Sequence, residues 1–277
     1  MKIMKNVFTA VFLLLLLVQI SLFGQMRNPE DVNDWRGKTI MVFSPHPDDE
    51  LYAAGTLAKL VKNGNKVYII QFCTGNAGSR DLEMTCERLA MIRRDEDIRA
   101  NKIIGIPKEN IIWLGHDDGL LEYVTEKDLC EKLCRLIRKY RPDAVFSYDP
   151  GAVWMQWHKT DHRMASFVSL DASRAAAYHL VFPHHRIYEK LMPFTVTDFF
   201  FFGSREPDYK VDITDVAELK CRAACQHTSQ FGKGNYKYKG PEMAPDDKEK
   251  LRRRWLQKDS EGRIYEHFRR VQESLSF

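Results

Sequence analysis

Short apolar runs alternate with amphipathic stretches along the first half of this chain, and this rhythm limits the folds open to it. Four runs rich in Ile, Val, Phe and Tyr are predicted strands: Thr39–Ser44, Lys66–Phe72, Asn110–Leu114 and Asp143–Tyr148. The segments between them have helical periodicity and end at Gly or Pro signals: Glu50–Lys62, Glu83–Ile104 and Thr125–Tyr140. Such alternation predicts right-handed βαβ units, and hence an α/β fold: a three-layer Rossmann-like domain with a mainly parallel sheet.

The second half of the chain is less regular. We predict a helix over Thr160–Arg174, strands over Val196–Phe202 and Tyr209–Ile213, and a helix from Asp215 to about His227. A chain of 277 residues with 44% hydrophobic positions can bury a full core. Because no repeat or convincing linker divides the sequence, residues 25–277 are expected to form a single domain.

The first 24 residues have the pattern of a secretory signal peptide. Lys2 and Lys5 form a positive region, residues 7–18 are almost wholly apolar, and the small residues Ser21 and Gly24 lie shortly before Gln25. We therefore expect an exported protein, periplasmic or secreted, with no membrane span after cleavage. The alternative is an uncleaved membrane anchor. A lipoprotein anchor would have no attachment residue, since no Cys lies near the cleavage point.

The net charge argues against a nucleic-acid partner. The formal charge is only +4, because 42 Lys and Arg are interleaved with 38 Asp and Glu. A small molecule or glycan is the expected partner, and the oligomeric state is not predicted.

The six cysteines are an even number, which fits a compartment that permits disulfides, but the sequence does not give their pairing. Cys130 with Cys134, and Cys221 with Cys225, have helical i,i+4 spacing, which is poor geometry for a direct bridge. The chain also lacks the Cys-x-x-Cys spacing of zinc sites. We expect the cysteines to be mainly small buried apolar residues.

The heptapeptide Ser44-Pro-His-Pro-Asp-Asp-Glu50 directly follows the first predicted strand. It places an imidazole and two adjacent carboxylates at the carboxyl end of that strand, where open α/β sheets usually form their active sites. His46 and Asp49 could bind a metal ion, with Asp48 facing the molecule that the metal activates. In the alternative interpretation, an Asp only caps the next helix and the His is a structural partner.

A third metal ligand is predicted from Trp157-His-Lys-Thr-Asp-His162, which follows the fourth predicted strand. Two His and one Asp with an open position are typical of metal hydrolases, in which the metal polarises a carbonyl and lowers the pKa of water to about 7. Asp48 could then serve as general base. Zn²⁺ suits this ligand set best, although other divalent ions are possible.

Together these motifs resemble the PIG-L (LmbE-like) family of zinc-dependent N-acetylglucosamine deacetylases. The resemblance covers roughly residues 38–231 and rests on the heptapeptide and Asp161-His162-Arg163. Further landmarks agree in order and spacing: Thr74-Gly-Asn-Ala-Gly78, Arg93-Arg-Asp-Glu96, Leu114-Gly-His-Asp-Asp-Gly119, Ser169-Leu-Asp-Ala172, Val211-Asp-Ile-Thr214, Lys220 and His227-Thr-Ser-Gln230.

The resemblance implies a role for each site residue. The zinc ligands would be His46, Asp49 and His162, and Asp48 would be the base that activates water. Arg93 would hold the substrate, although Arg94 leaves the register open. Asp161 would orient an active-site histidine from outside the ligand shell.

This chain departs from the family pattern at two places. The family usually has a histidine three positions before the metal histidine, but here that position is Lys159 and the nearest imidazole is His158. His158 is therefore the candidate acid for the leaving amine. Asn76 stands where the family commonly has a carboxylate, which puts the sugar contacts in doubt.

Four other features have a structural and a functional interpretation, and the structural one is favoured for each. The Gly75–Gly78 loop is expected to be a tight turn rather than a phosphate cradle. His184 and His185 are expected in a loop rather than as metal ligands. Phe199–Phe202 is expected to be a buried strand rather than a sugar platform. Lys248–Arg254 is expected to be a solvated helix face rather than a contact for anionic polysaccharide or lipid.

Two classes of function follow from the sequence. The favoured one is an exported zinc amidase that removes the acetyl group from an N-acetylated amino sugar or glycoconjugate. The alternatives are a non-catalytic glycan-binding relative and an amidase that acts on another N-acyl conjugate. The intact Asp48 argues against the binding protein, because binding alone does not need a free base beside the metal.

Overall fold

The structure is a computed structural model that describes residues 31–151 and 160–273. The chain divides into two compact units, residues 1–35 and 36–277. In the first unit, the short 3-10 helix η1 (Val32–Asp34) begins at Asp31, whose carboxylate accepts a hydrogen bond from the Asn33 amide. The predicted signal peptide, residues 1–24, and its boundary lie outside the described residues.

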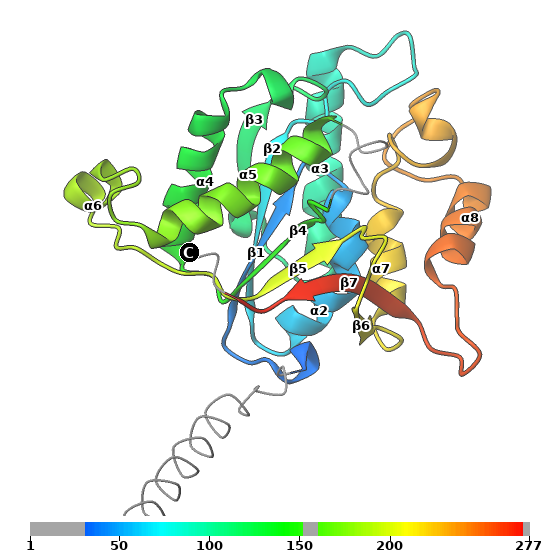
Figure 1. The fold of residues 1–277 in the computed structure, drawn as a ribbon. Helices are drawn as coiled ribbons and strands as arrows, with labels where there is room; N and C mark the ends of the chain where they lie inside the picture. The colour runs from blue at the N-terminus through cyan, green and yellow to red at the C-terminus, as the bar shows by residue number, and fades with distance from the viewer. Residues whose placement is uncertain (1–30, 152–159, 274–277) are drawn as a thin grey trace, which may run out of the picture. The chain divides into compact units, whose positions relative to one another are not determined.

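The second unit contains a seven-stranded sheet in the order β3-β2-β1-β4-β5-β7-β6 (Figure 1). The first five strands in this order are parallel, and β7 is antiparallel to both of its neighbours. The predicted α/β fold with a mainly parallel sheet is confirmed. The strands are β1 (Thr39–Ser44), β2 (Lys66–Cys73), β3 (Ile111–His116), β4 (Ala144–Tyr148), β5 (Phe199–Phe202), β6 (Tyr209–Asp212) and β7 (Tyr265–Val271).

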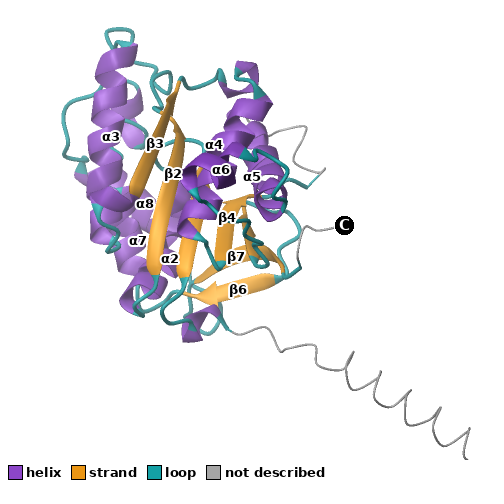
Figure 2. Cartoon of the chain, turned by 90° about the vertical axis from the view of Figure 1, so that its left-hand side faces the viewer, coloured by secondary structure: helices purple, strands orange, loops and turns teal. Residues whose placement is uncertain are grey.

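Helices cover both faces of the sheet, which gives three layers (Figures 1 and 2). On one face, α4 and α5 pack on each other, and α5 contacts β1 and β4. On the other face, α7 packs against α2, α3 and α8. The helices are α2 (Ala54–Lys62), α3 (Cys86–Ile103), α4 (Glu126–Tyr140), α5 (Thr160–Ala177), α6 (His184–Glu189), α7 (Ala217–Ala224) and α8 (Pro245–Trp255). Short 3-10 helices are η2 (Asp49–Ala53), η3 (Lys108–Asn110), η4 (Leu121–Tyr123) and η6 (Gly232–Asn235).

The central strands are buried on both faces, as a parallel sheet requires. Met41 and Phe43 of β1 belong to the core cluster formed with α4 and α5. Since side chains alternate along a strand, Ile40 and Val42 face the opposite helical layer, and both are fully buried. The expected buried strand of four phenylalanines, Phe199–Phe202, is confirmed as β5.

The strand order places a crevice between the ends of β1 and β4. From β1 the chain proceeds outward to β2 and β3, and it then returns to form β4 on the other side of β1. At such a switch point, the connections after the two strands diverge to opposite faces, which leaves an opening at their carboxyl ends. The loops that follow Ser44 and Tyr148 therefore lie beside each other at this opening.

Several element boundaries differ from the sequence prediction. The helix predicted from Glu83 begins only at Cys86, because the Thr85 hydroxyl accepts a hydrogen bond from the Arg88 amide and caps it there. The strand predicted from Val196 begins at Phe199. Strand β7 was not predicted, although its buried Glu266 and Phe268 alternate with the exposed His267.

The loop predicted around His184 and His185 is wrong, because these residues begin α6. His185 is buried, and its Nδ1 lies 3.1 Å from a guanidinium nitrogen of Arg138. Arg138 also donates to the carbonyl oxygens of Ala175 and Ala176 at the end of α5. This cluster therefore joins α4, α5 and α6.

All six cysteines are free. Cys73, Cys134 and Cys221 are buried, as expected for small apolar residues, whereas Cys86 at the start of α3 is exposed. Among the helices that the structure describes, none has the length and apolar character needed to cross a membrane.

Candidate metal and catalytic site

The heptapeptide lies at the carboxyl end of β1, in the crevice beside β4. Asp48 has a positive φ of 129°, which turns the chain sharply from the strand into η2. Although Asp48 occupies the position before η2, its side chain makes no capping hydrogen bond there. The helix-cap interpretation is therefore wrong for Asp48, whose carboxylate pairs with Arg93 instead.

The second half of the site comes from the first turn of α5. Asp161 and His162 are both buried, at the point where α5 begins beside β4. The two segments that sequence spacing predicted to converge do meet here, although 116 positions separate His46 from His162.

Three side chains form a compact triangle of ligand atoms. The Nδ1 atom of His46 lies 3.0 Å from Oδ2 of Asp49 and 3.2 Å from Nε2 of His162. The third edge, from His162 Nε2 to Asp49 Oδ2, is 3.3 Å. A tetrahedral zinc ion with bonds of about 2.0–2.1 Å separates its ligand atoms by roughly 3.3–3.4 Å. The donor set and its spacing therefore fit a divalent metal ion.

The other ring nitrogen of His46 faces two carboxylates. His46 Nε2 lies 2.9 Å from Asp161 and 3.0 Å from Asp118. With a metal ion at Nδ1, Nε2 carries the proton and donates to these carboxylates, an arrangement that fixes the ring and its tautomer. Asp161 lies where the resemblance predicted a residue outside the ligand shell. The sequence assigned no role to Asp118.

Asp161 is itself held by the loop after β3. Its carboxylate accepts hydrogen bonds from the backbone amides of Gly119 and Leu121. Burial raises the pKa of Asp161, but the hydrogen bonds from His46, Gly119 and Leu121 outweigh burial and bring this pKa to about 2. Asp161 therefore remains ionised beside His46 at neutral pH.

Tyr148, the last residue of β4, supports two of the ligands. Its hydroxyl donates a 2.7 Å hydrogen bond to Oδ1 of Asp49, which leaves Oδ2 directed at the two histidines. Its ring stacks on His162 with 4.2 Å between the centroids. Sequence reasoning assigned Tyr148 only to a strand, and a tyrosine at the carboxyl end of a predicted strand was the signal that could have found it.

Asp48, the candidate base, directly precedes Asp49 of the triangle. Its Oδ1 lies 3.3 Å from a guanidinium nitrogen of Arg93, and its side chain is 18% exposed. Burial raises the pKa of Asp48, Arg93 lowers it and the neighbouring Asp49 raises it, with a net value of about 7. A carboxylate with this pKa can accept a proton at neutral pH and release it again.

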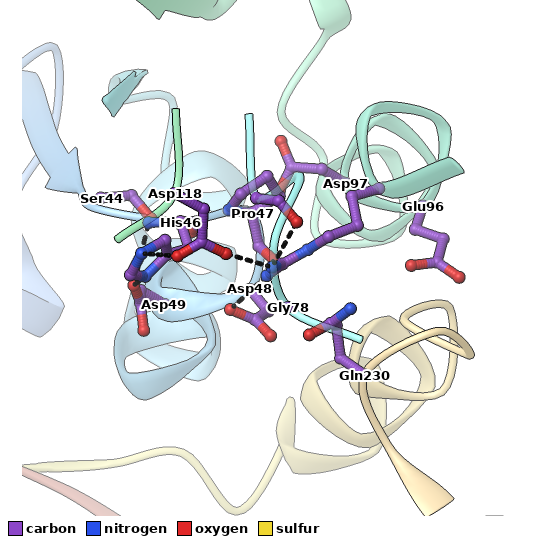
Figure 3. A network of polar contacts seen from close by, with 12 residues as sticks. Ser44, His46, Pro47, Asp48, Asp49, Gly78, Glu96, Asp97, Asp118 and Gln230 are labelled. Atoms are coloured by element: carbon purple, nitrogen blue, oxygen red, sulfur yellow. Dashed lines mark hydrogen bonds and ion pairs between the residues drawn. The ribbon is translucent and has the colours of Figure 1, made fainter. Parts of the chain in front are cut away.

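Arg93 lies at the centre of a buried network. One carboxylate oxygen of Asp118 lies within ion-pair distance of the Arg93 guanidinium and the other lies by His46, and Figure 3 shows Asp118 beside His46. The guanidinium donates to the carbonyl oxygens of Pro47 and Gly75, and it lies 3.6 Å from Asp118. Because Arg93 is only 3% exposed, the structure shows it supporting Asp48 and Asp118. Its predicted role in holding substrate stays a prediction.

Two neighbouring features are the second arginine of the pair and the glycine loop. Arg94 is exposed and lies over the ring of Trp113, so of the two arginines it is Arg93 that contacts Asp48 and Asp118. The expected tight turn is confirmed, because the backbone amide of Gly78 donates a hydrogen bond to the carbonyl oxygen of Gly75. Position 75 favours glycine, because its φ is +70° and a Cβ there would lie 2.5 Å from the Arg93 guanidinium.

A second layer of buried polar residues lies behind the heptapeptide. Glu50 accepts hydrogen bonds from the Ser44 hydroxyl and the Asp48 amide. Glu50 and Asp97 both accept from the amides of Gln71 and Asn101. Burial, followed by the charge of Glu50, raises the pKa of Asp97 well above its usual range. This layer fixes the backbone of Asp48, and sequence reasoning did not find it.

The remaining sequence candidates lie elsewhere or are not described. His158 and Lys159 fall outside the described residues. His184 lies 2.6 Å from Glu131, in the α6 cluster at the opposite end of α5 from His162. Asn76 binds the loop after β3, through the Asp117 side chain and the Asp118 amide.

A Rossmann-like sheet with a two-His, one-Asp triangle at its switch point, and the Asp48 carboxylate next in sequence to it, is an arrangement typical of α/β metal hydrolases. Comparison with known families agrees with this class. The chain belongs to the PIG-L (LmbE-like) family, whose model, described as GlcNAc-PI de-N-acetylase, matches residues 41–173. This is a family of metal-dependent N-deacetylases, so the predicted family is confirmed.

Individual relatives agree with the family assignment. Diacetylchitobiose deacetylase of Thermococcus kodakarensis is 33% identical over 196 residues, which is 70% of each chain. A probable N-acetyl-alpha-D-glucosaminyl L-malate deacetylase 2 of Bacillus anthracis is 26% identical, over 69% of this chain and 81% of that protein. Among solved structures, N,N'-diacetylchitobiose deacetylase from Pyrococcus horikoshii, complexed with its inhibitor MPG, has a TM-score of 0.70 and 27% identity. The match covers 85% of this chain and 84% of that chain.

Proposed function

We propose that this protein is a zinc-dependent deacetylase that hydrolyses the N-acetyl group of a GlcNAc-type amino sugar. The observation that carries the proposal is the triangle of His46, Asp49 and His162, with edges of 3.0, 3.2 and 3.3 Å, beside the carboxylate of Asp48. The relatives support the substrate class, since their names refer to diacetylchitobiose and N-acetylglucosaminyl malate. Zn²⁺ is the proposed ion because two imidazoles and one carboxylate are a common ligand set for zinc.

The site residues account for hydrolysis of an amide. His46, Asp49 and His162 would hold a divalent ion, which would supply Lewis-acid chemistry for the amide carbonyl and for water. Asp48 accepts a proton from the water that attacks the carbonyl carbon. The C–N bond then breaks, and the sugar nitrogen takes up a proton to leave as the amine, with acetate as the second product. His158 is the proposed donor of that proton.

The buried residues around Asp48 keep this base in position. Arg93 and Glu50 both bind the turn that contains Asp48, through the Pro47 carbonyl and the Asp48 amide. Tyr148 and Asp161 hold the ligands Asp49 and His46 from outside the triangle. A base and ligands fixed in this way need little reorganisation during the reaction.

Export is part of the proposal. The support is the sequence of residues 1–24, with its positive start, apolar centre and small residues before Gln25. Mass spectrometry of the mature protein tests it. A chain beginning at or near Gln25 in the periplasm or medium is expected, and a full-length chain in the membrane fraction would show that the segment is an uncleaved anchor.

Acetate release is the experiment that tests the activity. The chain is incubated with a panel of N-acetylated monosaccharides, oligosaccharides and glycolipids, before and after chelation and zinc add-back. We expect release from at least one N-acetylglucosamine compound, loss of release with chelator and recovery with Zn²⁺. No release from any compound by the zinc-loaded protein would favour a glycan-binding relative instead.

A further inference from the structure

A hollow of about 500 Å³ lies next to the candidate active site, where β5 ends and β7 begins. Its walls come from the residues after β5, the start of β7 and the end of α8, and Tyr52 of η2 also lines it. Tyr52 connects the hollow to the site, because its ring lies 5.6 Å from that of Tyr148, whose hydroxyl binds the ligand Asp49. A substrate with its acetamido group at the site can therefore extend over Tyr52 into the hollow.

Aromatic rings line the side of the hollow nearest the site. Tyr52 is 40% exposed, although its ring stacks on Phe202 and meets Trp255 edge to face at 6.3 Å. The ring is thus held rigidly by its neighbours while part of it remains open to a ligand. Rigid aromatic rings of this kind offer an apolar surface on which a sugar ring can pack.

The basic residues of the hollow outnumber the acidic ones, and two of them lack acidic partners. Lys220 is paired with Glu266 at 2.6 Å, and Arg263 lies near Glu261. In contrast, within residues 31–151 and 160–273, no carboxylate lies within ion-pair distance of the other two basic lining residues, Arg254 and Lys258.

The two acidic lining residues are already engaged. Glu266 accepts hydrogen bonds from the backbone amides of Gly55 and Thr56 in the first turn of α2, in addition to its pair with Lys220. Asp259 accepts from the backbone amides of Glu261 and Arg263. The charge that remains available to a ligand is therefore mainly the positive charge of Arg254 and Lys258.

We propose that this hollow binds an anionic group attached to the amino sugar, such as the carboxylate of a neighbouring acidic sugar, through Arg254 and Lys258. This inference rests on the proposed deacetylase function and deepens it by naming the substrate class. The sugar that carries the acid packs on Tyr52, and the two cations bind its carboxylate. The enzyme then acts preferentially on N-acetylglucosamine conjugates that carry a negative charge close to the acetylated ring.

Two disaccharides that differ only in charge test the proposal. In one, N-acetylglucosamine is linked to glucose, and in the other, to glucuronic acid. We expect the zinc-loaded wild-type enzyme to deacetylate the acidic disaccharide with a kcat/KM roughly five- to tenfold higher, because hydrogen bonds from the two cations stabilise its carboxylate and salt screens part of that gain. The preference is expected to disappear in Arg254→Gln/Lys258→Gln and to persist in Arg253→Gln, whose exposed side chain pairs with Glu249 instead.

Binding separates failure of this inference from failure of the proposed function. Calorimetry with the Asp48→Asn protein is expected to show tighter binding of the acidic disaccharide, and Arg254→Gln/Lys258→Gln in that background is expected to remove the difference. Equal kcat/KM and equal affinity for the two sugars in an active enzyme would overturn the anionic subsite and leave the deacetylase intact. Selective binding of the acidic sugar, together with no acetate release by the zinc-loaded wild-type protein, would keep the subsite and reject the proposed activity.

Discussion

The guanidinium of Arg93 binds both the carboxylate of Asp48, at 3.3 Å, and the carbonyl oxygen of the preceding residue, Pro47, at 2.7 Å. One buried cation therefore holds the proposed base by its side chain and by its backbone. The same cation opposes the rise in the pKa of Asp48 that burial causes. Arg93 thus sets both the position and the protonation of the base.

Removal of the Arg93 charge is expected to shift the pH dependence of catalysis. The base must be unprotonated to act, so kcat/KM falls as the pH drops below the pKa of Asp48. Because Arg93 lowers that pKa, Arg93→Gln should move the acidic limb of the profile to higher pH, by roughly 1 unit, together with a lower kcat.

The matched control is Arg94→Gln, which removes an exposed charge over Trp113. Its pH profile should coincide with that of the wild type. An acidic limb that stays in place in Arg93→Gln, while kcat/KM is measurable, would show that Arg93 does not control the protonation of the base.

Tyr148→Phe is expected to weaken metal binding. The change removes only the hydroxyl that donates to Oδ1 of Asp49, and the ring that stacks on His162 is retained. Loss of such an outer partner typically lowers metal affinity about 10–100-fold. Competition with a chelator gives the zinc dissociation constant, and Tyr123→Phe, at a tyrosine that is 78% exposed, serves as the control. Equal zinc affinity in all three proteins would contradict this role.

His227 is expected to make the fold sensitive to acid. Burial, followed by the charges of Arg93 and Arg99, lowers the pKa of His227 to about 3. Since an unfolded histidine has a pKa of about 6.5, only the unfolded chain binds the proton between these values. The stability that depends on neutral His227 is therefore complete above about pH 6.5 and is lost as the pH falls toward 3, by at most about 1.4 kcal/mol per pH unit.

Urea unfolding at about pH 7.5 and about pH 5 measures this contribution. The wild type should lose up to about 2 kcal/mol of unfolding free energy between these pH values. His227→Gln should lose less, whereas the exposed His267→Gln should behave as the wild type does. An equal loss in His227→Gln and the wild type would exclude His227 as the source.

Local patterns were sufficient to predict the elements that position the ligands. The apolar run Thr39–Ser44 and the helical period from Thr160 gave the correct elements for His46 and His162. The rule that parallel strands end at one edge then predicted that these two residues meet. Spacing in the sequence was informative here because each ligand is fixed within a few residues of an element boundary.

The residues that the sequence did not reveal act through contacts between distant segments. The sequence predicts Tyr148 only as the last residue of a strand. The contact of its hydroxyl with Asp49 depends on the register of the sheet. Asp118 lies in a loop, and its contact with His46 depends on the path of that loop over the strand ends. Strand β7 is stabilised by pairing with β5 and β6. The alternation of apolar and polar residues in its own sequence was too weak to predict a strand.

The central claim is that Asp48 performs the proton transfer while His46, Asp49 and His162 hold the metal ion. The direct test measures acetate release and bound zinc in the same Asp48→Asn preparation, beside the exposed Asp95→Asn as control. Asp48→Asn should retain one zinc ion per chain and lose about 10²–10⁴-fold in kcat. Turnover at the wild-type rate in Asp48→Asn with zinc bound would contradict the mechanism.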